Sequence, residues 1–249
     1  MLTKFPIHTL WAVPRSTSTA FEWMMRQRGD LACFHEPFGE AWYQGENPLW
    51  PRVQAESVRT PGLTLQSVQQ KLISTANNRP VFIKDFPHYI TSLLNDEFLS
   101  LFNHSFLIRD PAKSISSMYK HWPDFHADEV GLLEQRQLFD RISEINGKRP
   151  PVIDSDDLLR DPKTMVAKWC EAIGIDFIES ALSWQPGARE EVSWWDGGSF
   201  HENLRNSNGL KPQPIKHPTI DALSERAKSI YQEVKTHYEH MHQFRLQPD

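Results

Sequence analysis

The stretch IHTLWAVPRSTSTAF (residues 7–21) decides the expected fold. Its first seven residues are an apolar run between Pro6 and Pro14, which is typical of a buried strand. A polar turn, RSTS, follows the run, and the next residues place Phe21 and Met24 at helical spacing. The stretch therefore predicts a strand, a short loop and a helix in direct succession.

The same alternation recurs along the chain. Short apolar runs alternate with amphipathic segments, a pattern that predicts βαβ units and a parallel sheet covered on both faces. We expect one α/β domain over residues 1–249, with a sheet of about four to five strands flanked by helices and a P-loop-like strand–loop–helix at its N-terminus. The further strands are expected at 31–37, 81–84, 105–109 and 151–155, and helices at 63–75, 127–145, 163–174 and 219–243.

Two segments have no clean period. Residues 38–63 and 186–217 are rich in Gly, Pro, Asn and Trp, and we expect them to be loops. Residues 157–162 (DLLRDP) are expected to form a turn. Aromatic residues in or beside irregular segments can line an apolar pocket, which favours a ligand with a hydrophobic body. They are Trp42, Trp50, Trp122, Trp194 and Trp195.

Charge and composition exclude several classes of partner. The formal net charge is −5, from 32 acidic and 27 basic residues, so a nucleic-acid backbone is not expected to be the main partner. No apolar run is long enough for a membrane span, and we expect no membrane partner. Two cysteines, Cys33 and Cys170, cannot form a disulfide framework or a zinc site alone, which favours a reduced, cytoplasmic compartment.

The first turn has the composition of an anion site. Hydroxyl groups and backbone N–H groups stand at the start of a helix, where the helix dipole favours negative charge, and Arg15 adds a cation. The turn lacks the glycines and the lysine of a Walker A loop, which argues against ordinary ATP or GTP hydrolysis. The alternative is that Ser and Thr only cap the helix.

A second cluster of cations is expected at the same edge of the sheet. Lys84 and Arg109 each end a predicted strand, and Ser117 lies on the helix after Arg109. Because carboxyl ends of parallel strands meet at one edge, these groups can bind a second phosphate beside the first turn. The alternative is a structural turn in which Arg109 forms an ion pair.

Three stretches resemble the sulfotransferases. Residues 13–21 (VPRSTSTAF) resemble their 5′-phosphosulfate loop, roughly Pro-(Lys/Arg)-Ser-(Gly/Ser/Thr)-(Ser/Thr)-Thr. Residues 106–122 (FLIRDPAKSISSMYKHW) resemble their 3′-phosphate segment, in which an Arg is followed by (Asn/Asp)-Pro and later by a Ser. Residues 152–177 are similar to a later strand and helix of the family. The three matches occur in the family's order.

The resemblance implies 3′-phosphoadenosine 5′-phosphosulfate (PAPS) as donor substrate and adenosine 3′,5′-bisphosphate as product, with no metal. Arg109 and Ser117 would bind the 3′-phosphate, and Asn208, Gly209 and Lys211 would close over the nucleotide. The segments 38–63 and 186–217 would then cover the substrate and the nucleotide. The resemblance also allows a homodimer. The 5′-phosphosulfate would be held by Arg15, Ser16, Thr17, Ser18 and Thr19.

The base that deprotonates the acceptor is less clear from the sequence. The aryl and steroid branch of the family has a His two positions after the Lys that corresponds to Lys84, but Phe86 stands there. A Glu-Pro pair like that of the carbohydrate and bacterial branches makes Glu36 our first choice and His88 our second. Arg15 and Lys84 would stabilise the leaving phosphate. Because side chains alternate along a strand, one of His35 and Glu36 is expected to point toward the first turn and the other away from it. The structural alternatives are a helix N-cap or an ion pair with Arg15 for Glu36, a buried, satisfied side chain for His35, and a helix-start position for His88.

The sequence thus predicts a sulfotransferase that acts on a hydroxyl or amine of a small molecule. One alternative is another P-loop phosphotransferase, such as a small-molecule kinase, which the missing Gly-Lys-Ser/Thr disfavours. Another is a nucleotide-binding module that kept the fold and lost the chemistry.

Overall fold

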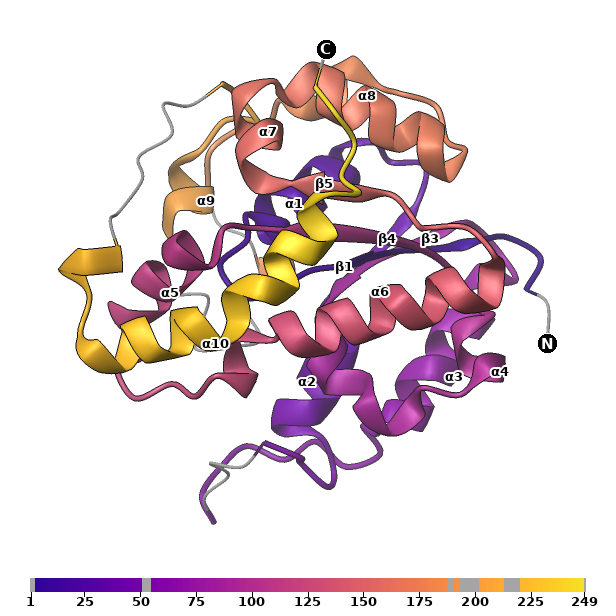
Figure 1. Cartoon of the computed structure of the whole chain (residues 1–249). Coiled ribbons are helices and arrows are strands. Elements are labelled where there is room, and N and C mark those ends of the chain that lie inside the picture. Colours follow the sequence, from indigo (N-terminus) through magenta and orange to yellow (C-terminus); the bar gives the residue numbers. More distant parts are fainter. Residues whose placement is uncertain (1–2, 51–54, 188–189, 193–201, 213–219, 249) are drawn as a thin grey trace.

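A sheet of five parallel strands forms the centre of the computed structural model (Figure 1). The order is β2-β3-β1-β4-β5, which confirms the predicted α/β class and parallel sheet. The model describes residues 3–50, 55–187, 190–192, 202–212 and 220–248. The strands are β1 (Ile7–Trp11), β2 (Ala32–His35), β3 (Val81–Asp85), β4 (Phe102–Ile108) and β5 (Val152–Asp154).

The register of the strands gathers their carboxyl ends at one edge. Lys84 of β3 stands opposite Leu10 of β1 and His35 of β2. The chain leaves β1 toward β2 and later returns to the other side of β1 with β4, so the strand order reverses at β1. Open α/β sheets bind ligands at such a switch point, outside the carboxyl ends of the strands.

Aromatic side chains fasten helices to both faces of the sheet. On one face, Phe82 of β3 packs with Phe21 of α1 (Ser18–Gln27) and Trp169 of α8 (Pro162–Ile173), and the Phe21 and Trp169 ring centroids are 4.8 Å apart. On the other face, Phe106 of β4 meets Phe139 of α6 (Leu132–Asn146). In Figure 1, α6 and α10 (Glu225–His242) lie in front of the sheet. The fold thus has three layers.

The segment 38–63 is not a loop throughout, as the sequence predicted. Helix α2 (Pro37–Gln44) begins within the Glu-Pro-Phe turn, with Pro37 in its first turn. The side chain of Asp85, at the end of β3, accepts a hydrogen bond from the backbone N–H of Phe38. An N-terminal cap supplied by a distant strand leaves no local signal, which is why the helix was missed.

Other element boundaries also differ from the prediction. The predicted turn at 157–162 is largely helix α7 (Ser155–Arg160), because Asp154 caps it by accepting from the N–H groups of Asp156 and Asp157. The last helix begins at Glu225 behind the cap Ser224, later than the predicted residue 219. The helix predicted at 127–145 is divided at Gly131, whose φ of 72° ends 3₁₀ helix η2 (Asp128–Val130) before α6 begins.

The remaining described elements are shorter or lie at the periphery. The predicted segment 186–217 contains α9, and its residues Trp194 and Trp195 lie outside the described part of the chain. Within the described ranges, no helix is long and apolar enough to cross a membrane. The remaining described helices are α3 (Leu65–Ala76), η1 (Pro87–Leu93), α4 (Asp96–Leu99), α5 (Pro111–Tyr119), η3 (Glu179–Leu182), η4 (Glu190–Val192), α9 (Glu202–Asn206) and η6 (Ile220–Ala222).

Candidate active site

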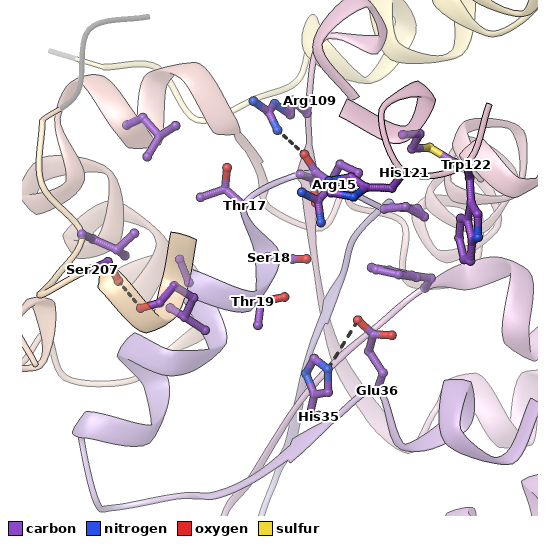
Figure 2. A pocket seen from close by; sticks show the side chains of 18 of the residues that line it. Arg15, Thr17, Ser18, Thr19, His35, Glu36, Arg109, His121, Trp122 and Ser207 are labelled. Atoms are coloured by element: carbon purple, nitrogen blue, oxygen red, sulfur yellow. Dashed lines mark hydrogen bonds and ion pairs between the residues drawn. The ribbon is translucent and has the colours of Figure 1, made fainter. Parts of the chain in front are cut away.

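A cavity of about 340 Å³ lies at the carboxyl edge of the sheet, where the switch point predicts a ligand. One wall is the loop between β1 and α1 together with Arg109, and another contains His35 and Glu36 (Figure 2). Leu204, Gly209 and Leu210, from the C-terminal part of the chain, also line it. Segments far apart in sequence therefore form the cavity.

The backbone of the loop is held in an unusual conformation. Arg15 and Thr17 have φ values of 63° and 72°, in the left-handed region that residues other than glycine rarely adopt. The Arg109 guanidinium donates to the carbonyl of Arg15, and the Ser155 hydroxyl donates to the carbonyl of Ser16. The left-handed residues Arg15 and Thr17 flank Ser16, which does not have a positive φ. When left-handed and right-handed backbone conformations alternate in this way, successive N–H groups turn to one side and form a concave site that suits an anion. The loop is thus shaped for an anion without any glycine.

Two guanidinium groups meet beside this loop. The Nε atom of Arg15 donates to the hydroxyl of Ser117 over 2.9 Å. Burial, and secondarily the charge of Arg109, lowers the pKa of Arg15, and burial also lowers the pKa of Arg109. The Arg109 Nε and the Ser16 hydroxyl are buried with no hydrogen-bond partner among the described residues. Buried polar groups are nearly always paired, so these two donors are candidates for contact with a ligand that can accept hydrogen bonds.

Glu36 forms the opposite wall of the cavity. It is the remaining non-glycine residue with positive φ in the described chain (41°), and it stands at the junction of β2 and α2. Its carboxylate accepts a hydrogen bond from the ammonium of Lys84, which is fully buried. The Nε2 atom of His35 lies 3.9 Å from the Oε1 atom of Glu36 (Figure 2). Backbone strain of this kind is commonly concentrated at functional sites.

A second ion pair lies beneath His35. The His35 Nδ1 atom is 2.6 Å from Oε2 of Glu22, whose other oxygen accepts from Arg26. Burial alone would raise the pKa of Glu22, but His35, Lys84 and Arg26 outweigh that effect and lower it to about 2. Glu22 is therefore a fully buried carboxylate that stays ionised at neutral pH.

The cavity also has an apolar side. Tyr43, Phe86, Tyr89, Met118 and Trp122 line it. The rings of Tyr43 and Tyr89 pack edge to face with centroids 5.6 Å apart, and burial raises the pKa of Tyr89 well above its usual value. A wall of this composition suits an apolar or aromatic ligand beside the anion site.

The sequence-family model for the sulfotransferase domain matches residues 7–238 of this chain. The chain belongs to the sulfotransferase domain family. The match spans the strand–loop–helix at the N-terminus and most of α10.

The chain is also similar to a curated protein and, in its fold, to two solved structures. The domain is 26% identical to the Branched-chain-amino-acid aminotransferase-like protein 2 of Arabidopsis thaliana over 243 residues, 92% of this chain and 41% of that protein. The chain thus spans less than half the length of this curated relative. Its fold is similar to the sulfotransferase domain of the Synechococcus PCC 7002 olefin synthase, with a TM-score of 0.50, 18% identity and coverage of 94% and 95% of the two chains. Its fold is also similar to the sulfotransferase domain from the curacin biosynthetic pathway. That comparison has a TM-score of 0.54 and 14% identity, and it covers 94% of this chain and 98% of the other.

The predicted site residues divide into those at the cavity and those away from it. Ser117 contacts Arg15, and Lys84 lies behind Glu36 rather than on the cavity surface. As far as the described residues form the lining, Asn208 and Lys211 are not part of it, and both are exposed. The residues that line the cavity are Arg15, Ser16, Thr17, Ser18, Thr19, Glu36, Arg109 and Gly209.

His88, the second choice for the base, does not belong to the described lining either. Its ring packs against those of Trp42, Phe86 and Tyr89. Burial lowers its pKa to about 4, and its Nδ1 atom has no hydrogen-bond partner in the described structure. The geometry therefore favours Glu36 over His88 as the group that faces an acceptor.

Several residues at the site escaped sequence reasoning. Glu22 was not singled out because it lies within a helix that was predicted from its apolar spacing. His121 lines the cavity from beyond the end of α5, and Ser155 fixes the loop backbone.

Two further residues of the cavity were considered in the sequence. His35 was considered together with Glu36 at the end of the second predicted strand, and Glu36 was preferred as the base. Trp122 was among the aromatic residues expected to line an apolar pocket, and it does line the cavity.

Proposed function

We propose that this sulfotransferase domain transfers a sulfuryl group from PAPS to a hydroxyl or amine of a small-molecule acceptor. The observation that carries the proposal is the loop between β1 and α1, where Arg15 and Arg109 converge and where the Ser16 hydroxyl and Arg109 Nε are buried with no partner among the residues that the structure describes. These donors fit the oxygen atoms of a phosphosulfate and a phosphate.

The donor is recognised at both ends in this proposal. The loop from Arg15 to Thr19 binds the 5′-phosphosulfate with backbone N–H groups and hydroxyls, and no lysine of a Walker A loop is needed. Arg109 and Ser117 bind the 3′-phosphate, which distinguishes PAPS from ATP. Gly209, on the cavity surface, closes over the nucleotide together with Asn208 and Lys211.

Glu36 is the proposed base. Its carboxylate takes the proton of the acceptor hydroxyl while the acceptor oxygen forms a bond to sulfur and the bond between sulfur and the phosphate oxygen breaks. Arg15 stabilises the negative charge that develops on the leaving phosphate. Because Lys84 is buried against Glu36, we assign it the orientation of Glu36 rather than direct contact with the phosphate.

The acceptor is expected to carry an apolar or aromatic body. Tyr43, Phe86 and Trp122 form a wall beside Glu36 that can hold such a body while its hydroxyl or amine faces the carboxylate.

Two measurements test the proposal. Calorimetry compares adenosine 3′,5′-bisphosphate with ADP and with ATP–Mg²⁺, and we expect the bisphosphate to bind at least tenfold more tightly than either. Radiolabelled PAPS is then incubated with panels of phenols, alcohols and amines, and a labelled product is expected from at least one. Tighter binding of ATP–Mg²⁺ would favour a kinase, and binding without any transfer across the panels would favour a silent module.

A further inference from the structure

The contact between His35 and Glu22 determines which nitrogen of the imidazole carries the proton. Glu22 is fully buried and its Oε1 atom is paired with the Arg26 guanidinium at 2.8 Å, which favours the ionised carboxylate, so Glu22 accepts rather than donates a hydrogen bond. The Nδ1 atom of His35, 2.6 Å away, must therefore be the donor. In the neutral ring, Nε2 is then left with its lone pair, and this is the nitrogen that faces Glu36.

Glu36 is poorly placed to keep a proton. Its carboxylate forms an ion pair with Lys84, and a neighbouring ammonium favours the charged form of a carboxylate. A proton taken from an acceptor would leave the Lys84 ammonium buried without its counter-ion, which is costly for a side chain with no exposed surface. The site needs another group to which this proton can pass.

We propose that His35, held by Glu22, is that group and receives the acceptor proton from Glu36; this rests on the function proposed above. The acceptor proton first moves to a Glu36 oxygen while the acceptor oxygen bonds to sulfur and the sulfur–phosphate oxygen bond breaks. It then moves to Nε2 of His35, which restores the Glu36–Lys84 pair and forms an imidazolium beside Glu22. No other reactant is required.

The distance and the surrounding charges permit this transfer. The 3.9 Å between Nε2 and Oε1 is closed by rotation of the carboxylate or by one bridging water, and such contacts commonly tighten when substrate binds. Glu22 and Glu36 face the two ring nitrogens, and each carboxylate is itself paired with a cation, Glu22 with Arg26 and Glu36 with Lys84. Arg26 and Lys84 balance the two carboxylates, so a proton on His35 adds one positive charge directly against Glu22.

The competing explanation is that the His35–Glu22 contact only holds α1 against β2. The two explanations differ in which kinetic constant they affect. We expect His35→Gln to lower kcat by roughly 100-fold. The affinity for adenosine 3′,5′-bisphosphate and the KM for the acceptor should each stay within threefold of the original protein. Glu22→Gln keeps the ring but removes its counter-charge, and we expect a loss in kcat of roughly tenfold.

His104 provides a matched control. It is also a buried strand histidine with two hydrogen-bond partners, Trp11 and the carbonyl of Leu99, but it does not belong to the described cavity lining. We expect His104→Gln to lower stability while kcat stays within threefold. If His35→Gln and His104→Gln change kcat and melting temperature in parallel, the proton-accepting role is overturned.

Chemical rescue supplies a test that a structural role would not pass. The smaller side chain of His35→Ala leaves space beside Glu36. Added imidazole should raise the kcat of this variant at least tenfold, and more basic substituted imidazoles should raise it further. Absence of any rescue in a folded variant that still binds adenosine 3′,5′-bisphosphate counts against the proposal.

Nuclear magnetic resonance tests the proton arrangement without any turnover. In protein with ¹⁵N-labelled histidine, His35 should show a protonated Nδ1 and, in its neutral form, an unprotonated Nε2. A neutral ring protonated at Nε2 instead would overturn the proposal even if sulfuryl transfer is observed. A protein that shows the expected tautomer but transfers no sulfuryl group would contradict only the proposed function, because the resonance measurement does not depend on turnover.

Discussion

The two polar walls of the cavity are built in opposite ways. On the donor side, Arg15 and Arg109 are close together, and the Ser16 hydroxyl and Arg109 Nε have no partner among the described residues. On the opposite side, the described charges are paired, Glu36 with Lys84 and Glu22 with His35. The difference teaches that donors without partners are available to a ligand, here the proposed anion, whereas a satisfied network holds its groups in one orientation.

The largest effect should come from the paired side. Glu36→Gln keeps the shape of the side chain but cannot accept a proton, so kcat should fall by roughly 1,000-fold while the affinity for adenosine 3′,5′-bisphosphate is retained. Steady-state kinetics and calorimetry measure the two quantities. Glu40→Gln, on the same helix α2 but not part of the described lining, is the control. Full activity in Glu36→Gln would remove Glu36 from the role of base.

The paired side should also govern stability in acid. The pKa of Glu22 is lowered from 4.5 to about 2 in the fold, so its stabilising contribution is fully present above pH 4.5 and is lost as the pH falls toward 2. This amounts to about 3 kcal/mol at neutral pH, of which about 2 kcal/mol is lost by pH 3.

Urea unfolding between pH 6 and pH 3 checks this contribution. The difference in unfolding free energy between the original protein and Glu22→Gln should shrink as the pH falls. Glu171→Gln, at an exposed position on α8, should give no such trend. A difference that stays constant with pH would mean that Glu22 is not ionised in the folded protein.

The donor side should respond through ligand selectivity. Arg109→Ala removes a cation whose Nε has no hydrogen-bond partner among the described residues. We expect the affinity for adenosine 3′,5′-bisphosphate to fall by roughly 10- to 100-fold. The loss for ADP, which lacks the 3′-phosphate, should be threefold or less. Calorimetry with both ligands measures the ratio, and Arg136→Ala, a surface arginine on α6, is the control. Equal losses for the two ligands would contradict the assignment of Arg109 to the 3′-phosphate.

The smallest effect has the opposite sign. Thr17 is a β-branched residue with positive φ and makes no side-chain cap for α1, so Thr17→Gly should raise stability by about 1 kcal/mol while it weakens nucleotide binding. Thr75→Gly, within α3, should instead lower stability. Thermal unfolding distinguishes them. A loss of stability in Thr17→Gly would show that the loop is not strained.

Much of the fold could be predicted because its signals are local. The apolar runs at 7–13 and 81–84 identified β1 and β3, and Gly174 marked the end of α8. Helices α2 and α7 were missed or read as a turn, because α2 depends on a cap from Asp85 and α7 is too short to show a period.

The candidate site could be predicted in part for the same reason. The order of residues after a strand is local, so the loop from Arg15 to Thr19 and Glu36 were identified before their positions were known. The direction of a side chain depends on its neighbours in space. For that reason Lys84 was expected on the cavity surface, although it lies against Glu36, and Glu22 was not expected at all.

The sequence by itself determined the α/β class, the strand–loop–helix and the resemblance to the sulfotransferases, because periodicity and short motifs are written along the chain. Only the tertiary structure decided which charges pair and which remain available to a ligand. Register and helix packing bring residues as distant as Glu36 and Lys84, or Arg15 and Arg109, within hydrogen-bond distance. Pairing energy depends on distance and burial in space, and neither quantity can be read from positions in the chain.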